Sequence, residues 1–264
     1  MLPLVGVPPT IAAIFSNYRD IFCRQEGFDH VSRYITGLLL SPNKTLEGIH
    51  SQQICSEGKK VKRRAMHAAV FEAGWKSEEL MPRHREVVSR DHRGKGREVI
   101  GIDWTLTHHE RGPKIFAVKR AYDYVDKRMS SYQTVVTAAI ANREMIDGLE
   151  VVVQNPDYQK EELVYLKMTS QQNYESREQV LERLEELLYY QKNRLAYRKR
   201  TEIAVDIVRQ IETEGHFADA DYAFDNGVLT LELTQLIEKH NKHWVSELES
   251  SRNINWCMRL AKGR

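Results

Sequence analysis

The stretch Glu98 to His109, reading EVIGIDWTLTHH, contains the residue whose setting points most directly to chemistry. Val99, Ile100 and Ile102 are β-formers, and Asp103 is the single acid among them. Strands buried on both faces read as continuous apolar runs, and an acid inside one costs several kcal/mol unless it is paired or bound to a metal. We therefore expect Asp103 to have a partner.

A second acid has a similar setting. Asp225 ends the short aromatic run of DYAFDNG, directly before the turn dipeptide Asn226-Gly227, which is expected to aim it. Taken alone, an acid in or after a strand is most often a turn former or a helix N-cap. Two acids at strand ends together suggest a cation site.

His108 and His109 follow the first acid and have two interpretations. One of them could line a scissile phosphate, but adjacent strand residues point to opposite faces, so at most one can do so. Exposed loop histidines are the favoured interpretation.

Two basic clusters are candidate contacts for nucleic-acid phosphates. A solvated basic face explains such clusters about equally well, and the net charge of +2 is too near neutral to decide. The first cluster holds Lys59, Lys60, Lys62, Arg63 and Arg64, and the second holds Arg93, Lys95 and Arg97.

The elements that would position these residues fall into two parts. Apolar residues recur at spacings of three and four from Thr10 to Ile54, which predicts helices, and Ala65 to Trp75 is compatible with another. The stretch Pro82 to Arg97 is polar, basic and glycine-bearing, and is interpreted as a mobile connector. We place the domain boundary here, with a helical module at 1–97 and a second domain at 98–264.

The second part, residues 98–264, is predicted to begin with consecutive strands and to continue with alternating helices and strands. Ser176 with Gln179 has a capping-box spacing and predicts a long charged helix to Arg200, within a helical insert at about 157–200. Gly215 is the expected stop of a helix that begins at Thr201. Strands are predicted at 98–106, 115–124, 132–141, 149–153, 222–225 and 243–248, with a helix at 228–240.

Composition excludes several classes of protein. The chain of 264 residues is 41% hydrophobic, which suffices for a full core and excludes collagen and disorder. No apolar run approaches the roughly 20 residues that a membrane-spanning helix needs. The three cysteines have neither zinc-ligand spacing nor a disulfide framework. We expect a soluble protein of the cytoplasm, with no membrane partner.

The order of strands and helices resembles the ribonuclease H-like fold, an α/β fold in which an antiparallel meander precedes alternating helices and parallel strands. At finer grain the chain resembles the DDE transposases of bacterial insertion sequences, through TGLLLSPNKTLEGI, VIGIDWT, GLEVVVQNP, TEIAVDIVRQIETEG, DYAFDNG and HWVSELESSRNINW. The resemblance implies a helical N-terminal module followed by an incomplete ribonuclease H-like mixed sheet with flanking helices.

The resemblance also implies a chemistry. In that family the two acids, here Asp103 and Asp225, bind Mg²⁺ (or Mn²⁺) with a third carboxylate for DNA cleavage and strand transfer at element ends. Carboxylate oxygens are the ligands that Mg²⁺ prefers, and two nearby cations need shared anionic charge. The family's third acid, a glutamate, lies on a helix after the last strand predicted here. The chain is therefore expected to be a transposase truncated before that acid and defective alone.

Two functions from different classes stay open at this point. The first is metal-dependent strand transfer on transposon ends and target DNA, with a homo-oligomer as a possible assembly. The second is a DNA-binding remnant that binds element ends without chemistry. A small-molecule α/β enzyme is a weaker third, since the chain has no GxGxxG, P-loop or GxSxG motif.

Overall fold

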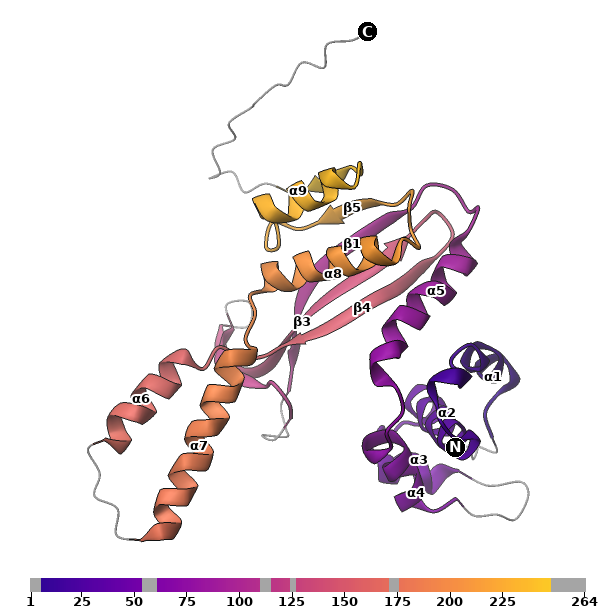
Figure 1. The fold of residues 1–264 in the computed structure, drawn as a ribbon. Helices are drawn as coiled ribbons and strands as arrows, with labels where there is room; N and C mark the ends of the chain where they lie inside the picture. The colour runs from indigo at the N-terminus through magenta and orange to yellow at the C-terminus, as the bar shows by residue number, and fades with distance from the viewer. Residues whose placement is uncertain (1–5, 54–60, 110–114, 124–126, 171–175, 248–264) are drawn as a thin grey trace, which may run out of the picture. The chain divides into compact units, whose positions relative to one another are not determined.

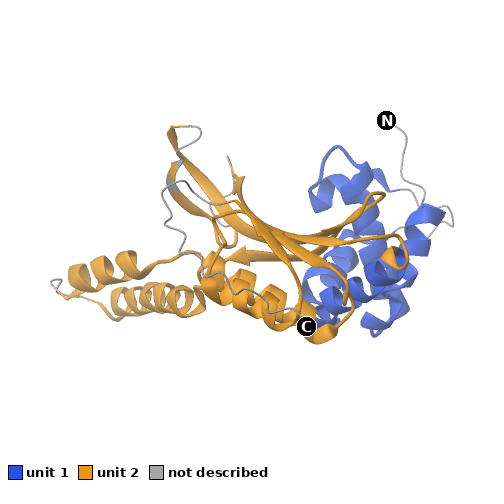
Figure 2. Ribbon diagram, turned by 90° about the horizontal axis from the view of Figure 1, so that it is seen from above, with its two compact units in different colours: residues 1–91 blue, residues 92–264 orange. Residues whose placement is uncertain are grey.

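The computed structural model describes residues 6–53, 61–109, 115–123, 127–170 and 176–247. The chain divides between Asp91 and His92 into two compact units, coloured separately in Figure 2. We call residues 1–91 the helical unit and residues 92–264 the sheet unit. None of the described helices is both long and apolar enough to cross a membrane.

The helical unit consists of short helices, as the spacing of apolar residues predicts. Thr45 caps α3, because its side chain accepts a hydrogen bond from the backbone N–H of Gly48 at 3.0 Å. The elements are α1 (Pro9–Ser16), η1 (Arg19–Ile21), α2 (Gln25–Leu40), α3 (Leu46–Gln52), α4 (Arg63–His67), the π-helical turn η2 (Ala68–Glu72), η3 (Ser77–Glu79) and α5 (Leu80–His92).

Helix α5 corrects the interpretation of Pro82 to Arg97 as a mobile connector. This helix of 13 residues, Leu80–His92, buries Val87, Val88 and the side chain of Arg85, which is 1% exposed. The spacing of apolar residues does not predict this helix, because its buried positions include charged residues as well as two valines. Only the turn after the helix keeps the expected glycine character, with positive φ at Gly94 and Gly96.

The sheet unit is built on a six-stranded mixed sheet, which confirms the predicted α/β class. Its path is β2-β3-β1-β5-β6, and β4 also pairs with β3. The pairs among β1 to β4 are antiparallel, whereas β5 runs parallel to β1 and β6 runs parallel to β5. The strands are β1 (Val99–His108), β2 (Lys119–Asp123), β3 (Arg128–Ala141), β4 (Ile146–Gln154), β5 (Asp221–Phe224) and β6 (Trp244–Ser246).

Among the described residues of the sheet unit, four helices lie between these strands, and the ends of α7 and α8 match the local sequence. Ser176 caps α7, accepting from the N–H of Gln179 at 3.2 Å, and Gly215 ends α8 in the left-handed region with φ 67°. The predicted long helix from Ser176 to Arg200 ends earlier, at Ala196. The helices are α6 (Gln159–Thr169), α7 (Arg177–Ala196), α8 (Arg200–Glu214) and α9 (Leu231–Lys239).

The core of the sheet unit lies between one face of the sheet and α8 with α9 (Figure 1). Alternate residues of each strand turn to this face, as the period of two requires. Its buried members include Ile100, Ile102, Val136, Ala138, Ile140, Tyr222 and Phe224 from strands and Ile203, Ile207, Val208, Ile211, Leu233 and Ile237 from helices.

Asp221 fixes the beginning of β5. Its carboxylate accepts hydrogen bonds from the Arg97 guanidinium at 2.5 Å and from the backbone N–H of His243 at 3.0 Å. The Arg97 hydrogen bond is the main cause that holds the pKa of Asp221 below its usual value. Asp221 therefore ties the turn before β1 and the start of β6 to the same strand end.

Candidate metal centre

The two predicted acids follow the last paired residues of adjacent parallel strands. Ile102 of β1 pairs with Phe224 of β5, so the next residue on each strand is an aspartate, Asp103 on β1 and Asp225 after β5. Neighbouring strands lie about 4.8 Å apart. Continuing the register by one residue sets the two aspartates side by side at the carboxyl end of β5, although 121 residues separate them along the chain.

The environment of Asp103 differs from the expectation. We expected a buried acid that needs a partner, but Asp103 is exposed and accepts a hydrogen bond from the N–H of Trp104 at 2.7 Å. It alternates with Ile102, which faces the core, so it lies on the opposite face of the sheet. Val151 and Val245 are also exposed there, at 59% and 72%. The apolar run is thus a strand with only one buried face.

Asp225 is half-buried and held by the turn that follows it. One carboxylate oxygen, Oδ1, accepts a hydrogen bond from the backbone N–H of Gly227 at 3.0 Å, so the Asn226-Gly227 turn does orient this acid. Gly227 also has no room for a side chain, because an added Cβ would overlap Nε1 of Trp104. The glycine is needed here for close approach.

Replacing Gly227 with alanine should lower the free energy of unfolding by about 1–3 kcal/mol, the usual cost of an extra methyl group in a filled site. Urea denaturation followed by circular dichroism measures this change. Gly148→Ala is the matched control, since a Cβ at Gly148 meets nothing within 4 Å. Equal midpoints for the two variants would contradict the close approach of Gly227 and Trp104.

Trp104 links the acid pair to α8, a contact that sequence reasoning missed. The guanidinium of Arg200, the first residue of α8, lies 3.6 Å from the centre of the Trp104 ring. Such a cation–π contact contributes about 0.5–2 kcal/mol. The buried indole Nε1 has no hydrogen-bond partner in the described part of the chain. No local sequence pattern predicts the contact between Trp104 and Arg200, because the two residues are far apart in sequence.

The two histidines do not join the acids. His109 binds the side chain of Gln133 at 2.7 Å, and His108 ends β1, exposed and within 3.3 Å of Ser130 Oγ. Five or six residues of extended strand separate them from Asp103, about 17–20 Å along the strand.

The basic residues of the two clusters have different settings. Lys62, Arg63 and Arg64 are exposed at the start of α4, with Arg63 paired to Glu47 at 3.1 Å, and Arg93 and Lys95 are exposed around the glycine turn. Arg97 is an anchor of Asp221. Lys59 and Lys60 lie outside the described residues.

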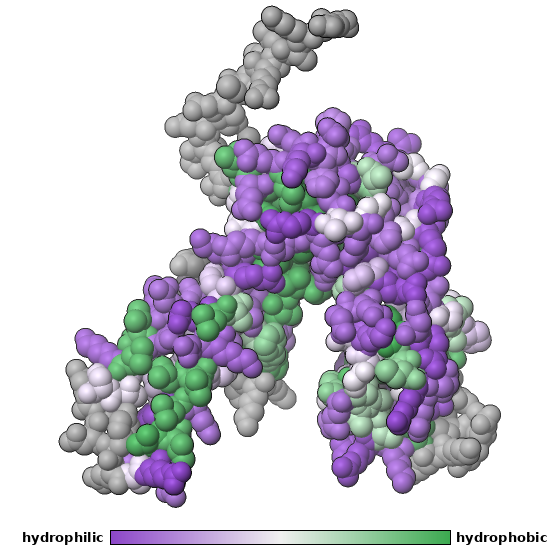
Figure 3. Space-filling view, viewed as in Figure 1, coloured by the Kyte–Doolittle hydropathy of each residue, from purple (hydrophilic) through white to green (hydrophobic). Residues whose placement is uncertain are grey.

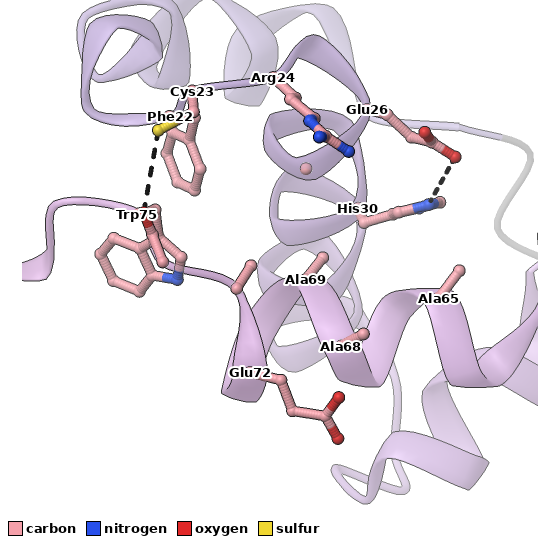
Figure 4. A pocket seen from close by; sticks show the side chains of 13 residues that line it. Phe22, Cys23, Arg24, Glu26, His30, Ala65, Ala68, Ala69, Glu72 and Trp75 are labelled. Atoms are coloured by element: carbon pink, nitrogen blue, oxygen red, sulfur yellow. Dashed lines mark hydrogen bonds and ion pairs between the residues drawn. The ribbon is translucent and has the colours of Figure 1, made fainter.

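The helical unit contains a pocket of about 610 Å³ that no sequence motif predicts (Figure 4). His30 lines it, is 7% exposed, and makes no hydrogen bond through either ring nitrogen within the described residues. Oε1 of Glu26 lies 3.7 Å from its Nε2, and burial, as the main cause, lowers the pKa of His30. Phe22 and Trp75 stack on the opposite side of the pocket.

The acid pair has the right chemistry for Mg²⁺. Each carboxylate uses Oδ1 for a hydrogen bond to the backbone, and no bond to either Oδ2 is found among the described residues. Mg²⁺ is commonly bound by one or two carboxylates and completes its shell with waters and substrate phosphates. Across the described ranges, no cluster of three or more His, Cys, Asp or Glu side chains suits a metal ion. Asp103 and Asp225 therefore fit as a pair of ligands to one ion.

No protein-family model, curated protein or solved structure matches the chain.

Proposed function

We propose that the protein is a metal-dependent phosphodiester-transfer enzyme with a ribonuclease H-like sheet. The support is the strand order β4-β3-β1-β5-β6, with three antiparallel strands followed by two parallel ones, and an aspartate at the same level of β1 and β5. The acid pair carries the proposal. It combines hard oxygen ligands with an exposed position that a phosphate backbone can reach.

Within that class, we propose a DDE-type transposase that acts on DNA at the ends of an insertion sequence. The sequence resemblance supports this more specific assignment, and the exposed basic residues Lys62, Arg64, Arg93 and Lys95 could contact phosphates, as could Arg63 if it released Glu47. Exposed lysine and arginine side chains give affinity for DNA without sequence preference. The family's third carboxylate has no counterpart in the described residues.

The residues of the site have distinct tasks in this proposal. Asp103 and Asp225 hold Mg²⁺, which when bound activates an attacking oxygen and stabilises the leaving oxygen. The turn at Gly227 orients the Asp225 carboxylate through its N–H. Arg200 holds Trp104 against α8, and so fixes the strand next to Asp103.

The test compares the wild type with Asp103→Asn and Asp225→Asn in two measurements. The first is Mn²⁺ binding, followed by electron paramagnetic resonance, and the second is cleavage of DNA that carries the element ends, in Mg²⁺ or Mn²⁺. Each substitution removes one anionic ligand and nearly preserves side-chain volume. We expect each to weaken Mn²⁺ binding at least about tenfold, 1.4 kcal/mol, and to abolish whatever cleavage the wild type shows without the third carboxylate.

Asp219→Asn is the matched control, because Asp219 is an exposed acid before the opposite end of β5. It should bind Mn²⁺ as the wild type does. Equal binding by all four proteins would refute the metal site. Mn²⁺ binding that depends on both acids, with no cleavage by any of the four proteins, would leave the non-catalytic DNA-binding protein as the better description.

A further inference from the structure

The arm formed by α6 and α7 is held together by aromatic and charged side chains. Tyr158 contacts Tyr189 and Tyr190, with ring centres 5.9 and 5.7 Å apart, and Tyr165 packs on Tyr190. Glu162 forms an ion pair with Arg194. The contacts between the two helices thus use mostly groups other than the leucines of α7.

Those leucines lie on the outside of the arm instead. Leu181, Leu184, Leu188 and Leu195 are each 49–71% exposed, and α7 has no buried residue. Their spacings of three, four and seven match the seam of a coiled coil. Helix α6 also has exposed apolar residues, namely Leu163, Val164, Leu166 and Met168. In Figure 3, hydrophobic residues run along the arm formed by the two helices.

The charge order along α7 indicates which partner would cover this stripe. Its first half has four glutamates, Glu178, Glu182, Glu185 and Glu186, against Arg177 and Arg183, and the charged residues of its second half are Lys192 and Arg194, so the two halves have opposite net charges. Two copies of α7 in parallel would set acid against acid and base against base. Antiparallel copies, related by a two-fold axis perpendicular to the helices, set the acidic half of each against the basic half of the other.

One pair of residues fixes the register. Glu185 and Lys192 are seven residues apart, and each directly follows a seam position, Leu184 or Gln191. In an antiparallel coiled coil, residues at this heptad position face each other across the seam. A two-fold axis near Leu188 therefore places Glu185 of each copy beside Lys192 of the other.

We propose that the α6–α7 arm is a homodimerisation surface, in which the leucine stripe of α7 packs antiparallel on a second copy of this chain. Helix α7 has 20 residues, about 30 Å and nearly three heptads. A two-stranded seam of this length is short for a stable interface of roughly 1,200–2,000 Å². Tyr190 and Arg194 face α6, which puts the leucine stripe on the other side of α7, so α7 alone forms the seam and we expect a micromolar Kd. The proposal is independent of the acid pair.

The experiment measures the mass of the full chain in solution by sedimentation equilibrium, up to about 100 μM, a hundredfold above a micromolar Kd. The wild type should be a dimer, and Leu184→Gln with Leu188→Gln should give a monomer of unchanged circular dichroism. Leu231→Gln is the matched control, since Leu231 is 72% exposed on α9, away from the arm. It should leave the dimer intact.

Charge reversal tests the antiparallel register. Glu185→Lys alone places lysine beside lysine twice per dimer and should raise Kd about tenfold or more, 1.4 kcal/mol. Adding Lys192→Glu restores both pairs and should restore the wild-type Kd. A monomeric wild type, or a dimer that persists in the double leucine variant, would overturn the surface. A double charge variant no better than Glu185→Lys would overturn the register.

Discussion

Lys242→Met should lower the free energy of unfolding of the sheet unit by about 3–5 kcal/mol, the cost of leaving one member of a buried ion pair alone. The Lys242 ammonium donates hydrogen bonds to Glu212 and to the carbonyl of Phe217, both at 2.7 Å. The two charged side chains are only 6% and 7% exposed. Tyr222 donates a third hydrogen bond, to Glu212 at 2.5 Å.

The loss of stability should exceed the loss from replacing a surface lysine, because Glu212 would stay buried without the ammonium that pairs with it. Burial, as the main cause, raises the pKa of the Tyr222 hydroxyl, so this tyrosine stays a donor to Glu212 but cannot replace the ammonium. Urea denaturation monitored by circular dichroism measures the change. The pair joins α8 to the segment before β6 and so supports the strand that leads to Asp225.

Two further variants separate the buried charge from the loss of a side chain. Lys239→Met, at an exposed position of α9, should change stability by less than about 0.5 kcal/mol. Lys242→Met with Glu212→Gln should recover a large part of the loss, because no unpaired charge stays buried. A double variant as unstable as Lys242→Met would show that the packing of the lysine stem, rather than the charge of Glu212, is decisive.

Ile49→Ala should destabilise the helical unit by about 2–5 kcal/mol, the range for removing a fully buried aliphatic side chain. Ile49 of α3 is 0% exposed and packs directly against Gly37 of α2. A Cβ at Gly37 would overlap the Ile49 side chain. The glycine therefore lets the two helices approach closely, and the isoleucine fills the space that this approach leaves.

The matched control is Ile14→Ala on α1, where the side chain is 54% exposed. It should cost much less, because most of its apolar surface is already in water. The measurement is again urea denaturation, with thermal unfolding as a second probe of cooperativity. Similar losses for Ile49→Ala and Ile14→Ala would contradict the close packing of α2 and α3.

Local signals in the sequence predicted the elements well wherever the relevant physics is local. The N-cap at Ser176 and the stop at Gly215 depend on backbone groups within a few residues, and both are present. The β-branched run of β1 and the turn after Asp225 likewise follow from short-range preferences. The mixed α/β class follows from the order of these elements.

Two predictions failed where burial is decided at long range. The sequence from Pro82 to Arg97 reads as a polar connector, but α5 forms because its neighbours accept Arg85 and two valines as buried groups. The run around Asp103 reads as a strand buried on both faces, but only one face is covered. Composition cannot distinguish a buried segment from an exposed one in either example, because it does not show which faces of a helix or strand other elements cover.

The sequence by itself therefore determined most of the helices and strands, with α5 as the exception, and which two acids could bind a cation. Only the tertiary structure decided that Asp103 and Asp225 follow paired positions of parallel strands, that Trp104 rests under Arg200, and that the leucines of α7 face outward. The physical reason is that helix and turn signals act over a few residues, whereas strand register and helix packing depend on contacts between residues far apart in the chain.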